Sequence, residues 1–199
     1  MQRHIQHPWL KPTPPADQPG LQTLQTLLAE NTGAIVVLDS FCGTGMSTGL
    51  LAEQYPDALV IGIDQSAHRL KKASALPANA VLIRAHCEVI WRELVARQQK
   101  LLAHYLLYPN PWPKPKHLSR RIHGHPAFSL LPQLGGIMEL RSNWPVYVEE
   151  FGIALHLLGF TSCVASVPTG NTALTLFERK YRNSGHDLWR LNANFKEGV

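Results

Sequence analysis

The stretch IVVLDSFCGTGMSTG, residues 35–49, decides the fold. It opens with an apolar β-prone run that predicts a buried strand over 35–38, and a turn containing Gly43 and Gly45 follows. Glycines let a backbone turn tightly and approach a bound molecule closely, and the next residues predict a helix to Tyr55. A second apolar run, 58–63, ends at Asp64. Strand, glycine turn, helix, strand and terminal acid in this order are typical of a nucleotide-binding α/β unit.

The rest of the chain continues the alternation of strands and helices. Short β-prone runs predict further strands at 80–83, 101–108, 136–141, 160–167 and 186–191, and helices are expected at 21–31, after Ser66, at 88–99 and at 145–158. Because these runs lack polar alternation, they favour a parallel sheet with helices on both faces. We therefore expect an α/β fold of the doubly wound, Rossmann-like class, with a mostly parallel seven-stranded sheet.

The first 20 residues differ in composition from the remainder. They contain five prolines, which exclude a continuous helix or a central strand, so residues 1–20 are expected to form an extended arm with Trp9 as its anchor. Residues 21–199 are expected to form one domain, as is usual for this length.

The charge distribution favours an anionic partner. The chain has 19 Lys and Arg against 14 acids, and residues 94–138 contain no acid at all. Such an acid-free basic segment is the pattern expected for contact with phosphates. Three cysteines without a Cys-x-x-Cys pair argue against a disulfide framework or a zinc site, so no metal is expected, and His123 and His125 are interpreted as polar loop residues. No apolar run has the length of a signal peptide or a membrane span, which favours a soluble, cytoplasmic protein.

The glycine turn favours S-adenosylmethionine over NAD as the bound nucleotide. A dinucleotide fingerprint needs a third glycine near Ser47 or Thr48, and none is present. Asp39, just before the turn, is unfavourable near a pyrophosphate but suits the cationic amino acid part of S-adenosylmethionine. Asp64 is placed to bind ribose hydroxyls.

The loop after the fourth strand reads YPNPWPKPKHLSRRI, residues 108–122. It leaves the carboxyl end of its strand and therefore faces the same crevice as the glycine turn. Its prolines restrict the backbone around Asn110 and Trp112. Trp112 offers a face for stacking a base, with basic residues behind it for phosphates; packing of this tryptophan into the core is the alternative.

Four ordered motifs resemble the bacterial tRNA (guanine-N7) methyltransferase family. The family's P-D-P-W, with its basic run, is similar to residues 109–112 followed by Lys114, Lys116, His117, Arg120 and Arg121. Its T-D-W is similar to 142–144, its T-x-F-E to 175–178, and its G-H-x-x-W to 185–189. The resemblance runs from about 35 to 191.

The resemblance implies methyl transfer from S-adenosylmethionine to N7 of a guanosine in tRNA. Asn110, Asn143 and Glu178 would then be catalytic, with Glu178 and Thr175 holding the Watson–Crick edge of the guanine. The substrate, tRNA, would contact Trp112, Lys114, Lys116, His117, Arg120, Arg121 and Thr175. Cofactor-binding positions would be Asp39, Phe41, Gly43, Gly45, Asp64, His86, Cys87, Glu88 and Tyr108.

Departures from the family pattern leave alternatives open. Asn110 and Asn143 stand where the family has aspartates, Phe41 where it usually has glycine, and His86 where an acid is often found, with Glu88 as a substitute. Removing two carboxylates suits a methyltransferase acting on an exocyclic amine or a small heteroaromatic substrate, or a non-catalytic relative that binds tRNA. An NAD dehydrogenase is a more distant alternative, and the oligomeric state is left open between monomer and homodimer.

Overall fold

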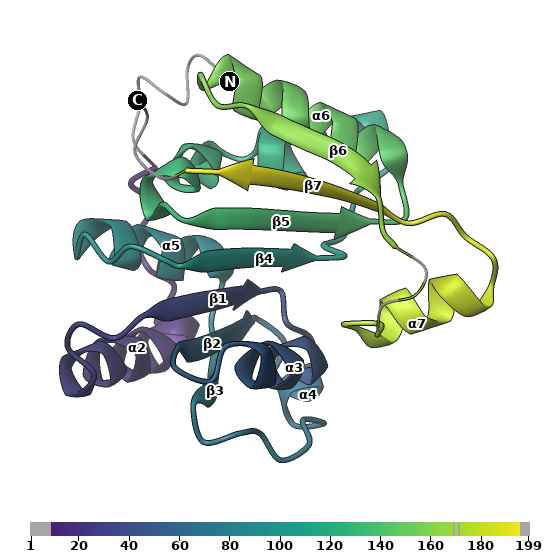
Figure 1. Ribbon diagram of the computed structural model, residues 1–199. Coiled ribbons are helices and arrows are strands. Elements are labelled where there is room, and N and C mark those ends of the chain that lie inside the picture. Colours follow the sequence, from purple (N-terminus) through teal and green to yellow (C-terminus); the bar gives the residue numbers. More distant parts are fainter. Residues whose placement is uncertain (1–8, 169, 171, 196–199) are drawn as a thin grey trace.

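A seven-stranded sheet with the order β3-β2-β1-β4-β5-β7-β6 runs through the computed structural model, which describes residues 9–168, 170 and 172–195 (Figure 1). Its strands are β1 (Val36–Ser40), β2 (Leu59–Asp64), β3 (Ala80–Arg84), β4 (Ala103–Leu107), β5 (Ile137–Ser142), β6 (Ser162–Ser166) and β7 (Trp189–Asn194). The first five pair in parallel, and β7 is antiparallel to both β5 and β6. The expected mostly parallel, doubly wound α/β class is confirmed.

Helices connect the strands on both faces. They are α2 (Gln18–Glu30), α3 (Met46–Gln54), α4 (Ala67–Leu70), α5 (Cys87–Ala96), α6 (Pro145–Leu157) and α7 (Leu176–Asn183). Between β4 and β5 the chain forms short 3-10 turns, η2 (Pro115–Arg120), η3 (Ile122–Gly124), η4 (Pro126–Leu130) and η5 (Pro132–Leu134), after η1 (Pro15–Asp17) near the start. In Figure 1, α7 lies beyond the arrowheads of β1 and β4, at the carboxyl edge of the sheet.

Two apolar clusters hold these layers together. The larger one lies under α5, α6 and the 3-10 turns and includes the fully buried Trp91, Phe128 and Phe151. The smaller one lies between α3 and the strands β1, β2 and β4. Every residue of β1 and of β4 is buried, as expected for central strands covered on both faces. This rigid centre fixes the positions of the loops that leave the carboxyl ends of both strands.

The N-terminal part departs from the expected arm. Helix α2 begins at Gln18 rather than Leu21, because Pro19 occupies the first turn, where a missing amide hydrogen costs nothing. Residues 1–8 of the arm lie outside the described residues. Trp9 packs against the larger cluster, with its ring 5.6 Å from that of His125 and the Arg92 guanidinium 5.1 Å away, as expected of an anchor.

Helix α7 and the 3-10 turns were not expected from the sequence. The seven residues after Leu176 are mostly charged, so the apolar face of α7 is short and consists of little more than Phe177 and Tyr181, whose rings stack. Its N-terminus is capped by the Thr175 hydroxyl, which accepts from the Glu178 amide at 3.0 Å. Across the described ranges, no helix is long and apolar enough to cross a membrane.

Candidate active site

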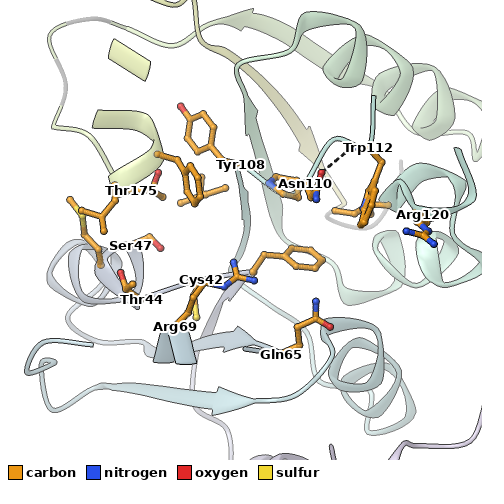
Figure 2. Close-up of a pocket in the computed structure, with 18 of the residues that line it drawn as sticks. Cys42, Thr44, Ser47, Gln65, Arg69, Tyr108, Asn110, Trp112, Arg120 and Thr175 are labelled. Carbon is orange, nitrogen blue, oxygen red and sulfur yellow. Dashed lines mark hydrogen bonds between the residues drawn. The ribbon is translucent and has the colours of Figure 1, made fainter. Parts of the chain in front are cut away.

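A cavity of about 290 Å³ opens where the loops after β1 and β4 meet (Figure 2). One wall comes from the glycine turn, a second from the loop after β4, and a third from the start of α7. The lining residues are Phe41–Thr44, Met46, Ser47, Gln65, Arg69, Glu88, Leu107–Asn110, Trp112, Arg120, Ile122, His125 and Thr175–Phe177. Segments far apart in sequence therefore converge on one cavity, as the order of strands predicted.

The glycine turn needs its glycines for two different reasons. Gly43 and Gly45 have φ angles of 63° and 77°, in the left-handed region that other residues rarely adopt. A Cβ added to Gly45 would lie 2.8 Å from Cδ1 of Leu82, so this position is also sterically closed. A Cβ on Gly43 would meet nothing within 4 Å, so this side of the turn stays open for a ligand.

Asp64 holds the glycine turn in place from the end of β2. Its carboxylate accepts hydrogen bonds from the Gly43 amide at 3.0 Å and the Ser66 amide at 2.8 Å, and Arg69 lies 3.4 Å away. The carboxylate is almost fully buried and does not line the cavity. Asp64 therefore shapes the cavity indirectly, because it fixes the backbone of the glycine turn that lines it.

Asp39 lies directly beneath the same turn. Its Oδ2 accepts from the hydroxyls of Ser47 and Thr48 at 2.6 and 2.7 Å, and only Ser47 of these residues lines the cavity. Its Oδ1 has no partner among the described residues. Burial raises the pKa of Asp39 to about 6, against the lowering effect of the two hydroxyls. This unpartnered oxygen beneath the turn is what a cationic ligand group would satisfy.

The expected residues after β3 divide into two groups. Glu88 lines the cavity, whereas His86 and Cys87 do not. The His86 ring lies 2.7 Å from the carboxylate of the buried Asp17, which joins it to the start of the chain. Cys87 is buried against the Ile63 carbonyl, and burial raises the pKa of its thiol. Of the three, Glu88 is in position to contact a bound nucleoside.

A second cavity, of about 520 Å³, adjoins the first on the side of α7. Asn110 lines both cavities, and Asn143 lines the second, so the structure brings the two carboxamides to one site. Asn110 accepts a hydrogen bond from the Trp112 amide at 3.2 Å, the dashed line in Figure 2. The other walls are mostly aromatic and proline side chains, and no carboxylate lines this cavity within the described part of the chain.

Three aromatic residues of the site adopt an unusual backbone conformation. Phe41, Tyr108 and Trp112 have φ angles of 64°, 53° and 46°. A left-handed conformation costs a residue other than glycine about 1 kcal/mol or more. The fold tolerates this cost at three positions around one cavity, which directs bulky rings into its walls.

The basic loop separates into exposed and buried members. Lys114, Lys116 and Arg120 are exposed, and the Arg120 guanidinium lies 4.8 Å from the centre of the Trp112 ring. Trp112 therefore lines the cavity instead of packing into the core, and the His117 ring meets it edge-on at 5.2 Å. These residues form a basic and aromatic rim suited to a nucleic acid.

Arg121 does not fit the expected phosphate contact. It is only 5% exposed, and its guanidinium donates to the carbonyls of Trp112 and Pro113 at 3.2 and 3.3 Å and to the Glu150 carboxylate. It also lies over the Trp144 ring at 4.9 Å. Arg121 is therefore a brace under the loop, and its donors are not presented to solvent.

Glu178 also differs from its expected role at the base edge. It is fully buried, and its carboxylate accepts from Arg141 at 3.1 Å, from Arg182 and from the Leu174 amide at 3.3 Å. Glu178 thus fastens α7 to β5 and does not line either cavity, whereas Thr175 does line the first. The sequence alone could not predict this burial, because no residue near position 178 indicates that Arg141 of β5 lies against Glu178.

Several lining residues were missed by sequence reasoning, chiefly Ser47, Gln65, Arg69, His125 and Phe177. Gln65 and Arg69 follow the terminal acid of β2, so their place at the carboxyl edge was the available signal. No group of three metal-binding side chains occurs in the ranges that the structure describes.

The residues present fit S-adenosylmethionine. The open face of Gly43, the unpartnered Oδ1 of Asp39 behind Ser47, and Glu88 in the lining of the same cavity give a site for a ligand that combines a cationic group with hydroxyl and amine donors.

Comparison with known proteins places the chain in a family. A family model described as "Putative methyltransferase" matches residues 33–191. The tRNA (guanine-N(7)-)-methyltransferase of Alcanivorax borkumensis is 30% identical, covering 78% of this chain and 70% of that protein. The enzyme of the same name from Sodalis glossinidius is 28% identical, covering 79% and 71%.

Solved structures share the fold. The antibiotic-resistance methyltransferase Kmr superposes with a TM-score of 0.60 at 21% identity, covering 87% of this chain and 92% of that one. A 16S rRNA (adenine(1408)-N(1))-methyltransferase from Catenulisporales acidiphilia, crystallised with its cosubstrate SAM, gives 0.62 at 19% identity, covering 86% and 91%. Motifs, fold and relatives agree: this chain belongs to the tRNA (guanine-N7) methyltransferase family of S-adenosylmethionine-dependent enzymes.

Proposed function

We propose that this protein transfers a methyl group from S-adenosylmethionine to N7 of a guanosine in tRNA, and that it does so in the cytoplasm with residues 21–199 acting as one methyltransferase domain. The observation that carries the proposal is the shared cavity, in which the glycine turn after β1 and the Asn110–Trp112 segment after β4 face each other. A methyl donor on one wall and a base on the other would thereby be held within reach of transfer.

The first cavity suits the cofactor. The glycine turn, Ser47 and Glu88 would hold S-adenosylmethionine, with Asp39 and Asp64 fixing the turn from below. When bound, this cofactor supplies an electrophilic methyl group. The positive φ of Phe41 directs its ring into the same wall, which helps to exclude water from the reacting atoms.

The second cavity suits the target base. Guanine N7 carries a lone pair and loses no proton when it is alkylated, so the protein need not supply a general base. Positioning is then the main requirement. Tyr108, Trp144 and Tyr181 offer faces for stacking, while Asn110 and Asn143 offer carboxamides that both donate and accept hydrogen bonds. The exposed Lys114, Lys116 and Arg120 extend the site toward the tRNA backbone.

The carboxamides of Asn110 and Asn143 determine the rate of methyl transfer that we expect. The base gains a positive charge on methylation, and a nearby carboxylate would stabilise it more than a carboxamide does. We therefore expect activity that is slow but present, because orientation is kept while one source of charge stabilisation is missing.

The test is incubation of the purified protein with labelled S-adenosylmethionine and tRNA from cells that lack this modification, followed by mass spectrometry of the nucleosides. A 7-methylguanosine peak that requires the protein is the expected result. The matched control is Asn110→Ala, which removes the carboxamide shared by both cavities. Cofactor binding without any 7-methylguanosine would contradict the proposal and favour an exocyclic amine or another small acceptor.

A further inference from the structure

Arg69 occupies a central place that neither the expected site nor the proposed mechanism uses. It lies in the short helix α4 and lines both cavities, and Figure 2 shows its side chain extending from α4 toward the middle of the pocket. A group at this point borders both the first cavity, proposed for the cofactor, and the second cavity, proposed for the target base. Its charge therefore acts on whatever enters either cavity.

The ion pair with Asp64 leaves most of the hydrogen-bonding capacity of Arg69 unused. Its ion pair with Asp64 spans 3.4 Å, and that carboxylate already accepts from two backbone amides. The Arg69 side chain is 44% exposed, and a guanidinium has five N–H donors in a planar fork. It can hold Asp64 with one edge and a second anion with the other.

The lining of the second cavity points to the sign of that second group. Arg69 is its one charged lining residue in the described part of the chain, and the rest are aromatic rings, prolines and two carboxamides. In the first cavity Glu88 is accompanied by Arg69 and Arg120. The charge that the second cavity presents to a ligand is thus the guanidinium of Arg69, with aromatic faces beside it, while its partner Asp64 stays buried outside the lining.

We propose that Arg69 is a specificity-determining residue that binds a backbone phosphate of the RNA next to the target nucleotide; the inference rests on the proposed tRNA substrate. Guanidinium and phosphate match in a bidentate geometry, and a phosphate next to an inserted base lies near the rings on which that base stacks. Arg69 would therefore select a nucleotide within a chain over a free base.

The test compares four proteins in binding an unmodified tRNA transcript by fluorescence anisotropy between 50 and 200 mM salt. They are the wild type, Arg69→Gln, Arg69→Lys and Lys72→Gln. Lys72 is an exposed cation three residues away that lines neither cavity, so its variant removes the same charge outside the site. Each phosphate contact contributes about 0.7–0.9 to the slope of log affinity against log salt.

Arg69→Gln is expected to bind the transcript about tenfold more weakly and to lower the slope by about 0.7–0.9. Arg69→Lys should keep the slope, and Lys72→Gln should keep both slope and affinity. An unchanged slope in Arg69→Gln, or an equal loss in Lys72→Gln, would overturn the proposal. Nucleoside mass spectrometry on the same samples separates the two ideas. If the wild type makes 7-methylguanosine while Arg69→Gln keeps the wild-type salt slope, the proposed role of Arg69 is wrong and the proposed function stands. If the wild type makes no 7-methylguanosine, the proposed function itself is wrong.

Discussion

Replacing Arg121 with methionine should destabilise the protein without removing a phosphate contact. The change deletes a buried guanidinium that donates to the carbonyls of Trp112 and Pro113 and to Glu150. Methionine retains much of the length and the apolar stem but none of the donors. The loop that carries the basic rim would then lose its support from below.

The magnitude follows from these contacts. Hydrogen bonds from a charged donor contribute about 1.5–3 kcal/mol each. The carbonyls of Trp112 and of the exposed Pro113 lose theirs, so the lower end of this range applies to both. Glu150 is 36% exposed and keeps its 3.1 Å contact with His123, so its loss is discounted for solvent. A total of about 3 kcal/mol results, which for a chain of this size lowers the melting temperature by roughly 6–12 °C.

Urea denaturation followed by tryptophan fluorescence measures the effect, with Arg120→Met as the matched control. Arg120 is exposed and its guanidinium lies over the Trp112 ring, so its loss should cost less than about 1 kcal/mol of stability. It should, however, weaken tRNA binding and reduce its salt dependence. The reasoning would be refuted if Arg121→Met unfolded at the wild-type urea concentration while losing tRNA affinity.

Three further predictions concern the carboxylates and carboxamides of the site. Burial raises the pKa of Asp39 to about 6, above its unfolded value, so its contribution to stability is present below pH 4 and is lost as the pH rises through 6. Asp39→Asn should therefore raise the free energy of unfolding more at pH 8 than at pH 4, as urea titrations at both pH values would reveal. Asp64→Ala should abolish calorimetric binding of S-adenosylmethionine, because the Gly43 amide loses its acceptor; unchanged affinity would speak against this wall as the cofactor site. Asn110→Asp combined with Asn143→Asp should raise the single-turnover rate of N7 methylation about tenfold or more, and a rate that falls or stays the same would show that charge does not limit the reaction.

The centre of the sheet was predictable because β1, β2 and β4 are buried on both faces. Runs such as that ending at Asp39 or at Asp64 contain little but β-prone apolar residues, and burial leaves them few alternatives. The cavity walls that follow directly from strand ends, at Gly43 and Asn110, were found for the same reason. Sequence order places them at the carboxyl edge whatever the details of the loops.

The predictions for Glu178 and Arg121 differ from the structure for one physical reason, which is pairing between polar groups that are distant in the sequence. Glu178 and Arg121 were expected to face the substrate because their types and motifs suit it. Both are instead buried by partners that come from other elements, Arg141 in β5 and Glu150 in α6. Helix α7 was missed because it is short and mostly charged, and the Thr175 cap and the ion pairs that support it do not produce an apolar period in the sequence.

The left-handed residues around the cavity have a consequence for how the enzyme can change. The left-handed backbone at Phe41, Tyr108 and Trp112 would be less strained with glycine, and each such substitution would relieve about 1 kcal/mol of strain. Each would also delete a ring from the wall. Because Phe41 packs against the larger apolar cluster and Tyr108 against the smaller one, glycine at these positions would lose more packing energy than the strain it relieves. Variants that widen this site should therefore be less stable than the wild type, although their backbone is less strained.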